Sequence, residues 1–325
     1  REGSLNVHLN REIRSKSGLK LEKDVVRQVA VNTSLPAVRF IGNGVIIPQS
    51  TQLTIPFQAV YLRGVVVRVI KILEQNIGQF LQINNLDETS DLMRVGRLVA
   101  RKTLFLDDDA SLDLSRWNTF AVDLKQLIQP EPGAIYRIEL SFNKDLSAYP
   151  CADAKKISKE QILAEDEIKF KEETSRFDEG GYYYYNGDLD WSDYKYRERN
   201  DPCANSYYFN KVAGKNVLAT NLGLIAMAGE DNEMTVLVHN LINTYPEAGV
   251  EVAVYNFQHQ VLATGVTDDK GHVKVKLSSG KPFYIIASYG KQRSYLRVDG
   301  GSALSLSSFD VSGEVVQKGI KGFIY

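Results

Sequence analysis

The residues whose types could do chemistry are few, and they are spread along the whole chain. The four histidines fall in four different segments: His8, His239, His259 and His272. The sequence contains no Gly-x-Ser-x-Gly elbow, no His-Glu-x-x-His pair and no phosphate-cradling glycine loop. We therefore expect solvated surface histidines, no catalytic residue, no cofactor and no metal site, and we predict that the chain is not an enzyme.

The acidic run Asp188-Leu-Asp-Trp-Ser-Asp193 has carboxylates spaced for a hard cation. An EF-hand loop would need glycine at its sixth position and a bidentate glutamate at its twelfth. Those two positions hold Asp193 and Arg199 instead. We therefore expect a solvated acidic loop rather than a calcium site.

Cys151 and Cys203 are the only cysteines in the chain. Zinc sites use closely spaced cysteines or neighbouring histidines, and neither occurs around these two positions. The wide spacing favours a disulfide and hence an oxidising compartment, and two unpaired, buried cysteines are the alternative. A bridge would close a loop of about 50 residues and add roughly 4 kcal/mol of stability by restricting the unfolded chain.

The segment between the cysteines is acidic and rich in aromatic residues, which are candidates for an interaction surface. Tyrosine and tryptophan dominate interface hot spots and can stack on sugar faces. The alternative, which we favour, is that these residues clamp the segment onto neighbouring β-domains as a substitute core. The candidates are Tyr182, Tyr183, Tyr184, Tyr185, Trp191, Tyr194 and Tyr196.

One helix is predicted among the elements that must position these residues. Ser158 can act as its N-cap and Gln161 as the capping-box partner, while Ile157 and Ile162 are placed for a hydrophobic staple. The helix is expected to end before Gly180-Gly181.

The sequence on either side of this insert has the two-residue period of half-buried strands, for example at 120–124 and 136–142. Turn-rich stretches separate such runs at the spacing of antiparallel sandwiches. We predict an all-β fold of tandem Ig-like sandwiches at residues 35–149 and 206–310. Between them, residues 150–205 form a disulfide-bracketed, partly helical insert.

A tyrosine corner is predicted at the start of the strand at 136–142. In the run Pro-Glu-Pro-Gly-Ala-Ile-Tyr at 130–136, the hydroxyl of Tyr136 can bond back to the upstream backbone.

The two ends of the chain are interpreted as parts of further domains. Residues 1–34 hold only two or three predicted strands, too few for a stable sandwich, so we assign them to the C-terminal strands of a preceding β-domain. Residues 311–325 are predicted to be the first strand of a following domain. The chain is expected to be a piece of a longer protein.

Composition excludes some partners. The chain of 325 residues has 39 basic and 40 acidic side chains and a net charge of -1, so no broad positive field attracts nucleic acid. No apolar run reaches the roughly 18–20 residues of a membrane-spanning helix, and the first residues lack a signal pattern. We expect a soluble piece, with a signal or a possible lipid anchor upstream.

Several longer runs, taken in order, are more specific than a strand pattern. They include VRFIGNGV at 38–45, VVVRVIKI at 65–72, QFLQINNLD at 79–87, DPC at 201–203, LGLIA at 222–226, SLSSFDVS at 305–312 and KGIKGFIY at 318–325. Together these runs resemble the N-terminal half of a bacterial alpha-2-macroglobulin of the kind found in Bacteroides-like organisms, and the resemblance covers nearly the whole chain from Ala37 onward.

This resemblance implies macroglobulin-like β-sandwiches in the periplasm or cell envelope, within a broad-spectrum protease inhibitor that entraps proteases after bait cleavage. Its implied partners are proteases, through the full-length parent, and neighbouring domains of the same chain. No Cys-x-Glu-Gln thioester run occurs here and no bait region can be identified, so no functional residue is carried over. The expected role of this part is a structural scaffold.

The insert is then expected to fix the relative orientation of the two sandwiches, so that reducing its cysteines would loosen the pair. The alternative function is a cell-surface module that binds a glycan or a protein through the Tyr-rich insert.

Overall fold

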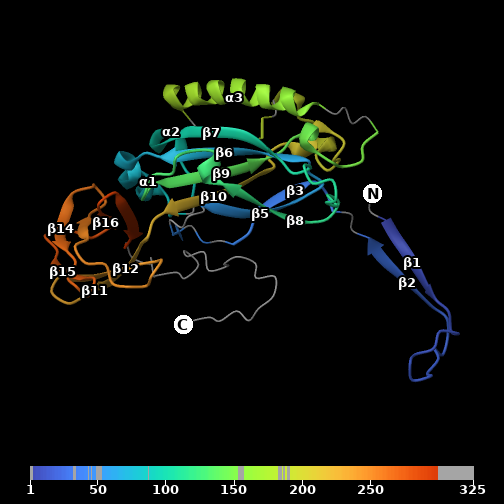
Figure 1. Cartoon of the computed structure of the whole chain (residues 1–325), viewed down its shortest axis with the longest axis horizontal. Coiled ribbons are helices and arrows are strands. Elements are labelled where there is room, and N and C mark those ends of the chain that lie inside the picture. The colour runs from blue at the N-terminus through green and yellow to red at the C-terminus, as the bar shows by residue number, and fades with distance from the viewer. Residues whose placement is uncertain are drawn as a thin grey trace.

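The computed structural model describes residues 3–31, 34–42, 44, 46–48, 53–86, 88–152, 157–181, 185, 187–188 and 191–298. They form a first sandwich that carries a long helix, a second sandwich at one end of it, and a separate hairpin at the other end (Figure 1). Tyr182, Tyr183, Tyr184 and the strand predicted at 311–325 lie outside the described residues.

The first sandwich consists of a three-stranded and a five-stranded sheet. The smaller sheet has the order β3-β5-β8, with strands Ala37–Phe40, Thr54–Val60 and Asn118–Asp123. The larger sheet has the order β4-β10-β9-β6-β7, with strands Ile46–Ile47, Val212–Ala219, Ile135–Ser141, Gly64–Ile72 and Gly96–Phe105. All neighbouring strands are antiparallel except β4 and β10.

The core of this sandwich lies between its two sheets. Alternate residues Ile55 and Phe57 of β5 meet Ile138 and Leu140 of β9, and all four are fully buried. Burying each such side chain contributes roughly 1.5–3 kcal/mol. The predicted tyrosine corner is confirmed, because the hydroxyl of Tyr136 accepts a hydrogen bond from the Glu131 amide at 2.9 Å.

Helix α3 (Lys159–Glu179) covers the outer face of the five-stranded sheet and adds a third layer (Figure 1). Its predicted start is confirmed: the Gln161 amide donates to Ser158 Oγ and the Ser158 amide donates to Gln161 Oε1, both at 3.3 Å. The helix ends at Glu179, as expected, and the φ of 71° at the following Gly180 suits glycine. Because α3 lies above it, the middle of β6 is buried on both faces.

One strand lies in a different sheet from the one expected. We expected Val212–Ala219 to lie in the block 206–310, but this strand (β10) pairs with β9 along seven residues. The chain therefore returns from the insert to the first sandwich before it enters the second. A hydrophobic period shows that a strand exists, but it does not show which sheet the strand joins.

The second sandwich has two antiparallel sheets. The first has the order β11-β12-β15, with strands Leu222–Ala228, Glu233–Asn240 and His272–Lys276. The second has the order β14-β13-β16-β17, with strands Val261–Val266, Glu251–Tyr255, Tyr284–Tyr289 and Gln292–Arg297. Its core includes Val236, Val254 and Ile285. The expected positive φ of Gly271, before β15, is confirmed at 69°.

A separate apolar cluster joins the two sandwiches. Two short helices, α1 (Ile77–Ile83) and α2 (Leu92–Val95), contribute Phe80 and its neighbours, and the second sandwich contributes Phe283 and Tyr284. The insert reaches this joint through Phe170 and Phe177 of α3. The expectation that the insert sets the orientation stays a prediction, and α1 and α2 share this joint with the insert.

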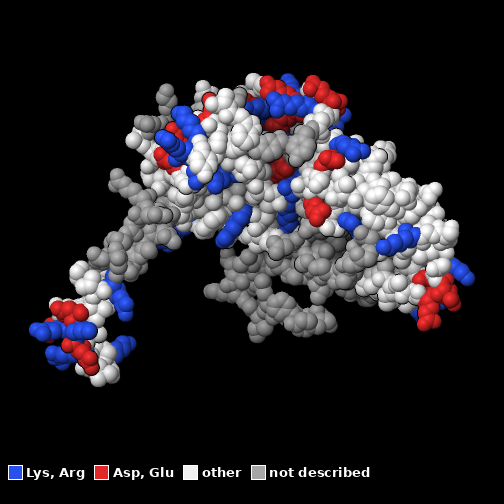
Figure 2. Space-filling view, turned by 180° about the vertical axis from the view of Figure 1, so that it is seen from behind, with Lys and Arg blue, Asp and Glu red and all other residues white. Residues whose placement is uncertain are grey.

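The hairpin at the start of the chain consists of β1 (Gly3–Leu9) and β2 (Val25–Val31), and it extends away from the sandwiches (Figure 1). On the face shown in Figure 2, acidic and basic side chains are intermixed both on the outer side of α3 and at the hairpin tip. None of the helices in the described ranges is long and apolar enough to span a membrane.

Candidate functional site

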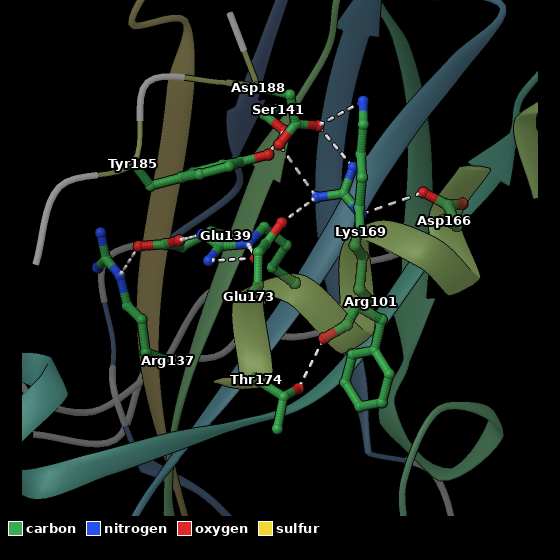
Figure 3. A network of polar contacts seen from close by, with 12 residues as sticks. Arg101, Arg137, Glu139, Ser141, Asp166, Lys169, Glu173, Thr174, Tyr185 and Asp188 are labelled. Carbon is green, nitrogen blue, oxygen red and sulfur yellow. Dashed lines mark hydrogen bonds and ion pairs between the residues drawn. The ribbon is translucent and has the colours of Figure 1, made fainter. Parts of the chain in front are cut away.

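A row of charged residues crosses the five-stranded sheet beneath α3 (Figure 3). The strand register places Arg68 of β6 directly between Arg101 of β7 and Glu139 of β9. All three side chains are at least nine-tenths buried. Two arginines side by side repel each other and have lost their hydration, so the fold must supply carboxylates to them.

Helix α3 supplies two of these carboxylates from above. Asp166 and Glu173 are seven residues apart, which is about two turns, so they lie on the same face of the helix. Glu173 bridges the arginines, because its two oxygens accept hydrogen bonds at 2.7 Å from Arg68 and from Arg101. Asp166 accepts a bond from the Thr103 amide at 2.6 Å.

The described end of the Tyr-rich segment completes the cluster from the side. Asp188 accepts hydrogen bonds from both terminal nitrogens of Arg101, at 2.5 and 3.2 Å, and lies 3.7 Å from Lys169. The ring of Tyr185 lies 3.6 Å from the Arg68 guanidinium, and its hydroxyl is 2.8 Å from Ser141 Oγ. The insert is thus attached to the sheet by charge and by a cation–π contact.

The charges in this buried ion cluster balance. The cationic members are Arg68, Arg101, Arg137 and Lys169, and the anionic members are Glu139, Asp166, Glu173 and Asp188. Each cation has at least one anionic partner within ion-pair distance. Losing one partner would leave an uncompensated buried charge, which is far more costly than replacing a whole pair.

These contacts shift the pKa values of Arg101, Asp188 and Tyr185. Burial alone would lower the pKa of Arg101, but Asp188, Tyr185 and Glu173 outweigh it, so this pKa is raised. Burial alone would raise the pKa of Asp188, yet the charge and hydrogen bonds of Arg101 hold this pKa below its usual value. Burial of the Tyr185 hydroxyl, aided by Asp188, raises the pKa of the phenol.

The arrangement is suited to holding a helix on a sheet and not to acid–base chemistry. A carboxylate works best as a general base when its pKa is near neutrality, whereas Arg101 holds the pKa of Asp188 below its usual value. Among the residues that the structure describes, no group of three or more His, Cys, Asp or Glu could hold a metal ion. Asp188 is the first carboxylate of the acidic run whose spacing suggested a calcium loop, and it forms an ion pair with Arg101.

The predicted disulfide is confirmed, with Cα atoms of Cys151 and Cys203 5.5 Å apart. Tyr208, a buried member of the first core, donates a hydrogen bond to the Pro202 carbonyl next to the bridge. The bridge is therefore attached to the first sandwich.

The described aromatic residues of the insert point in different directions. Tyr185 faces the ion cluster, whereas Trp191 and Tyr196 are 60% and 66% exposed. Trp191 and Tyr194 contact Phe209, with ring centroids 4.3 and 4.7 Å apart. The interaction surface predicted for these residues stays a prediction.

Sequence reasoning missed the residues that form the cluster. A signal was present, because Arg68 interrupts the apolar run Val-Val-Val-Arg-Val-Ile, and Arg137 and Glu139 alternate with apolar residues in β9. A charge inside a run that is otherwise buried on both faces predicts a buried partner. Which partner it meets depends on strand register and on the helix above.

His259 differs from the expected solvated histidine. Its Nδ1 lies 3.3 Å from the Tyr284 hydroxyl, and its Nε2 is buried without a hydrogen-bond partner. The ring packs against Gly78 of α1, where an added Cβ would lie 2.6 Å from Nδ1. This histidine belongs to the joint between the sandwiches.

Comparisons with known proteins agree with this architecture. Residues 219–315 match the family model of the bacterial alpha-2-macroglobulin MG3 domain. No curated protein sequence matches the chain.

Among solved structures, the chain is similar to native alpha-2-macroglobulin from Escherichia coli spanning domains MG0-NIE-MG1. That similarity has a TM-score of 0.52 and 15% identity, and it covers 91% of this chain and 74% of the other. A second structure from Escherichia coli, spanning NIE-MG1, gives a TM-score of 0.46 at 14% identity over 81% of this chain and 97% of the other. The native conformation of the Escherichia coli protein gives a TM-score of 0.48 at 14% identity, over 91% of this chain and 15% of the other. The first of these likenesses, at 15% identity, establishes the fold alone.

Proposed function

We propose that this chain is a member of the bacterial alpha-2-macroglobulin family and a structural scaffold within a protease-trapping protein. The match of residues 219–315 to the MG3 domain model supports this proposal. Proteases would then be partners of the whole protein, and neighbouring domains would be the direct partners of this part. The Bacteroides-type subgroup and an upstream lipid anchor stay predictions.

The observation that carries the proposal is the charge-balanced ion cluster. Glu173 connects the helix to the sheet by accepting hydrogen bonds from both Arg68 and Arg101. Asp188 connects the insert to Arg101. Groups that satisfy one another in this way are not available to a substrate. They give a rigid three-layer body, which is what a scaffold needs in order to transmit a rearrangement that starts elsewhere.

We place this part in the periplasm or cell envelope. The Cys151–Cys203 disulfide supports the proposal, because such bridges persist in oxidising compartments. The test is oxidation state: cysteine labelling of the protein in its native host should find no free thiol. Two labelled thiols would contradict this location.

The scaffold role is tested by comparing this chain with the full-length product of its gene. A trap that encloses a protease should block cleavage of a large protein substrate and spare a small peptide substrate. The full product is expected to do so, and the 325-residue chain alone is expected to inhibit neither reaction. Inhibition by the chain alone would contradict the scaffold role and indicate a direct protease site.

The second candidate is a binding module that uses the insert. The exposure of Trp191 and Tyr196 favours it, because large exposed aromatic residues mark interaction surfaces. A glycan array and a pull-down with the chain, each repeated with Trp191→Ala, test this function. Saturable binding that the variant loses at unchanged melting temperature would establish it, and no saturable ligand would favour the scaffold.

A further inference from the structure

One histidine lies inside the joint between the two sandwiches. His259 belongs to the hairpin loop between β13 and β14 of the second sandwich, and its ring contacts α1 of the first. A Cβ added to Gly78 would lie 2.6 Å from Nδ1 of this ring and 2.8 Å from Cε1, so the imidazole fits directly against the backbone of α1. The surroundings of this ring therefore depend on the joint being closed.

The hydrogen bonds of the ring suit a neutral imidazole. Nδ1 lies 3.3 Å from the Tyr284 hydroxyl, which can donate or accept, while Nε2 is buried without a hydrogen-bond partner in the described part of the chain. A neutral ring leaves one nitrogen unsatisfied here. An imidazolium carries a proton on both nitrogens, so it would bury a charged N–H donor without an acceptor, which costs considerably more free energy.

The charged groups on the side of the first sandwich have other partners. Helix α1, with the sequence Ile-Gly-Gln-Phe-Leu-Gln-Ile, has no titratable residue. Glu74, just before it, forms an ion pair with Arg293 at 2.8 Å, and Glu88, after it, accepts hydrogen bonds from the amide and the side chain of Asn85. Within the described ranges, neither carboxylate forms an ion pair with His259.

The second sandwich supplies phenols and a cation to this site. The strand register places Tyr255, Tyr284 and Arg297 in one row across β13, β16 and β17. Burial, with a contribution from Tyr255, raises the pKa of Tyr284 to about 12, so the phenol beside His259 stays neutral at physiological pH. Arg297 would repel an imidazolium, and residues 256–260 contain no titratable group besides His259. The surroundings therefore disfavour the protonated ring.

We propose that the joint is a pH-sensitive switch, which is closed while His259 is neutral and is opened by protonation of this ring. Opening exposes the ring to water, which solvates the charge. The open form then binds one more proton than the closed form, so the equilibrium shifts toward opening as the pH falls. Histidine changes its charge between pH 5 and 8, so the opening belongs to the mildly acidic range. Each sandwich has its own core, and both remain folded.

The test measures hydrogen exchange of α1 and of residues 256–260 in the whole 325-residue chain at pH 7.5 and pH 5, corrected for the intrinsic rate at each pH. A histidine in contact with water titrates near pH 6.5, so the opening constant should rise by up to about 30-fold between these values. Corrected exchange in β5 and β12, inside the two cores, should stay unchanged. The radius of gyration from X-ray scattering should increase at pH 5.

Matched variants make the assignment to this ring specific. His259→Asn removes the titration, and asparagine tolerates the positive φ of 64° at this position. This variant should show the same exchange in α1 at both pH values. His272→Asn, on the exposed side of β15, removes a histidine outside the joint and should retain the full response.

Two results would overturn the proposal. Unchanged exchange in α1 of the native chain at pH 5 would mean that His259 is a packing residue only. An equal response in His259→Asn would assign the response to another group. If this variant already opens the joint at pH 7.5, the midpoint of the native response decides: a midpoint between about pH 5 and 7 supports the histidine, and one below about pH 4.5 belongs to carboxylates and contradicts it. None of these results bears on the scaffold role, because the switch is inferred independently of it.

Discussion

At the scale of single residues, the two arginines of the sheet determine how the helix is used. Arg68 and Arg101 are neighbours in adjacent strands and are almost completely buried. No apolar helix could cover them, since each would lose hydration without gaining a partner. This explains why Asp166 and Glu173 alternate with Ile162, Phe170 and Phe177 on the inward face of α3.

Glu173→Gln tests this account most directly. Glutamine keeps the shape but removes the charge that both arginines share, so we expect a loss of about 3–5 kcal/mol in the free energy of unfolding. Urea titration followed by circular dichroism measures it. Glu172→Gln, on the exposed neighbouring position, should change stability by no more than about 0.5 kcal/mol. Equal effects of the two variants would show that the cluster does not hold the helix.

The lowered pKa of Asp188 predicts that the stability of the fold depends on pH. Its pKa is lowered in the folded chain, chiefly because Arg101 outweighs the effect of burial, whereas an unfolded aspartate titrates near a pKa of about 3.9. The contribution of ionised Asp188 to the free energy of unfolding is therefore fully present above about pH 4. It is lost as the pH falls through the lower pKa of the folded chain. The difference in urea midpoint between the native chain and Asp188→Asn should be large at pH 7 and shrink below about pH 4. A difference that does not change with pH would refute the pairing.

At the scale of elements, the disulfide and the helix act on the same sandwich. The bridge lies next to Pro202, which bonds the buried Tyr208 of the first core, and α3 covers the five-stranded sheet of that core. The insert therefore covers the first sandwich. It is held there by the disulfide, by the buried ion pairs, and by the apolar side chains Ile162 and Phe177 near the two ends of α3.

Removal of the bridge should accordingly affect one sandwich. We expect the double variant Cys151→Ala, Cys203→Ala to lose roughly 2–4 kcal/mol of stability in the first sandwich. Hydrogen exchange resolves the two bodies, and exchange in β12 and β16 of the second sandwich should remain unchanged. Faster exchange in both sandwiches would contradict this assignment of the bridge to the first sandwich.

At the scale of the whole molecule, the local features were predictable from the sequence and the assembled ones were not. The capping box at Ser158, the tyrosine corner at Tyr136 and the alternation of β9 depend on neighbours a few residues away. The ion cluster depends on β6, β7 and β9 aligning in register and on a helix about 70 residues farther along the chain. The helix α1 has apolar residues at helical spacing, Ile77, Phe80 and Leu81, but seven residues are too few for periodicity alone to separate it from a turn.

The joint between the sandwiches is the feature through which a scaffold would transmit movement. Gly78 of α1 fits against His259 and Tyr284 of the second sandwich. Arg297 adds a hydrogen bond to Asn85 at 3.0 Å, and Glu74 pairs with Arg293 at 2.8 Å. Each sandwich also has its own core, so opening the joint should not unfold either one.

Gly78→Val should open this joint. The added Cβ would lie 2.6 Å from His259 Nδ1 and 2.8 Å from the Tyr284 hydroxyl, closer than real contacts allow. These two packed rings must therefore move, and we expect the two bodies to shift with them. We expect a larger radius of gyration in X-ray scattering and faster hydrogen exchange around His259, while both sandwiches keep their circular dichroism. Gln79→Val places the same side chain on the exposed side of α1 and should change neither measurement. If Gly78→Val leaves the radius and the exchange unchanged, the joint yields locally, and α1 cannot be the element that fixes the orientation of the sandwiches.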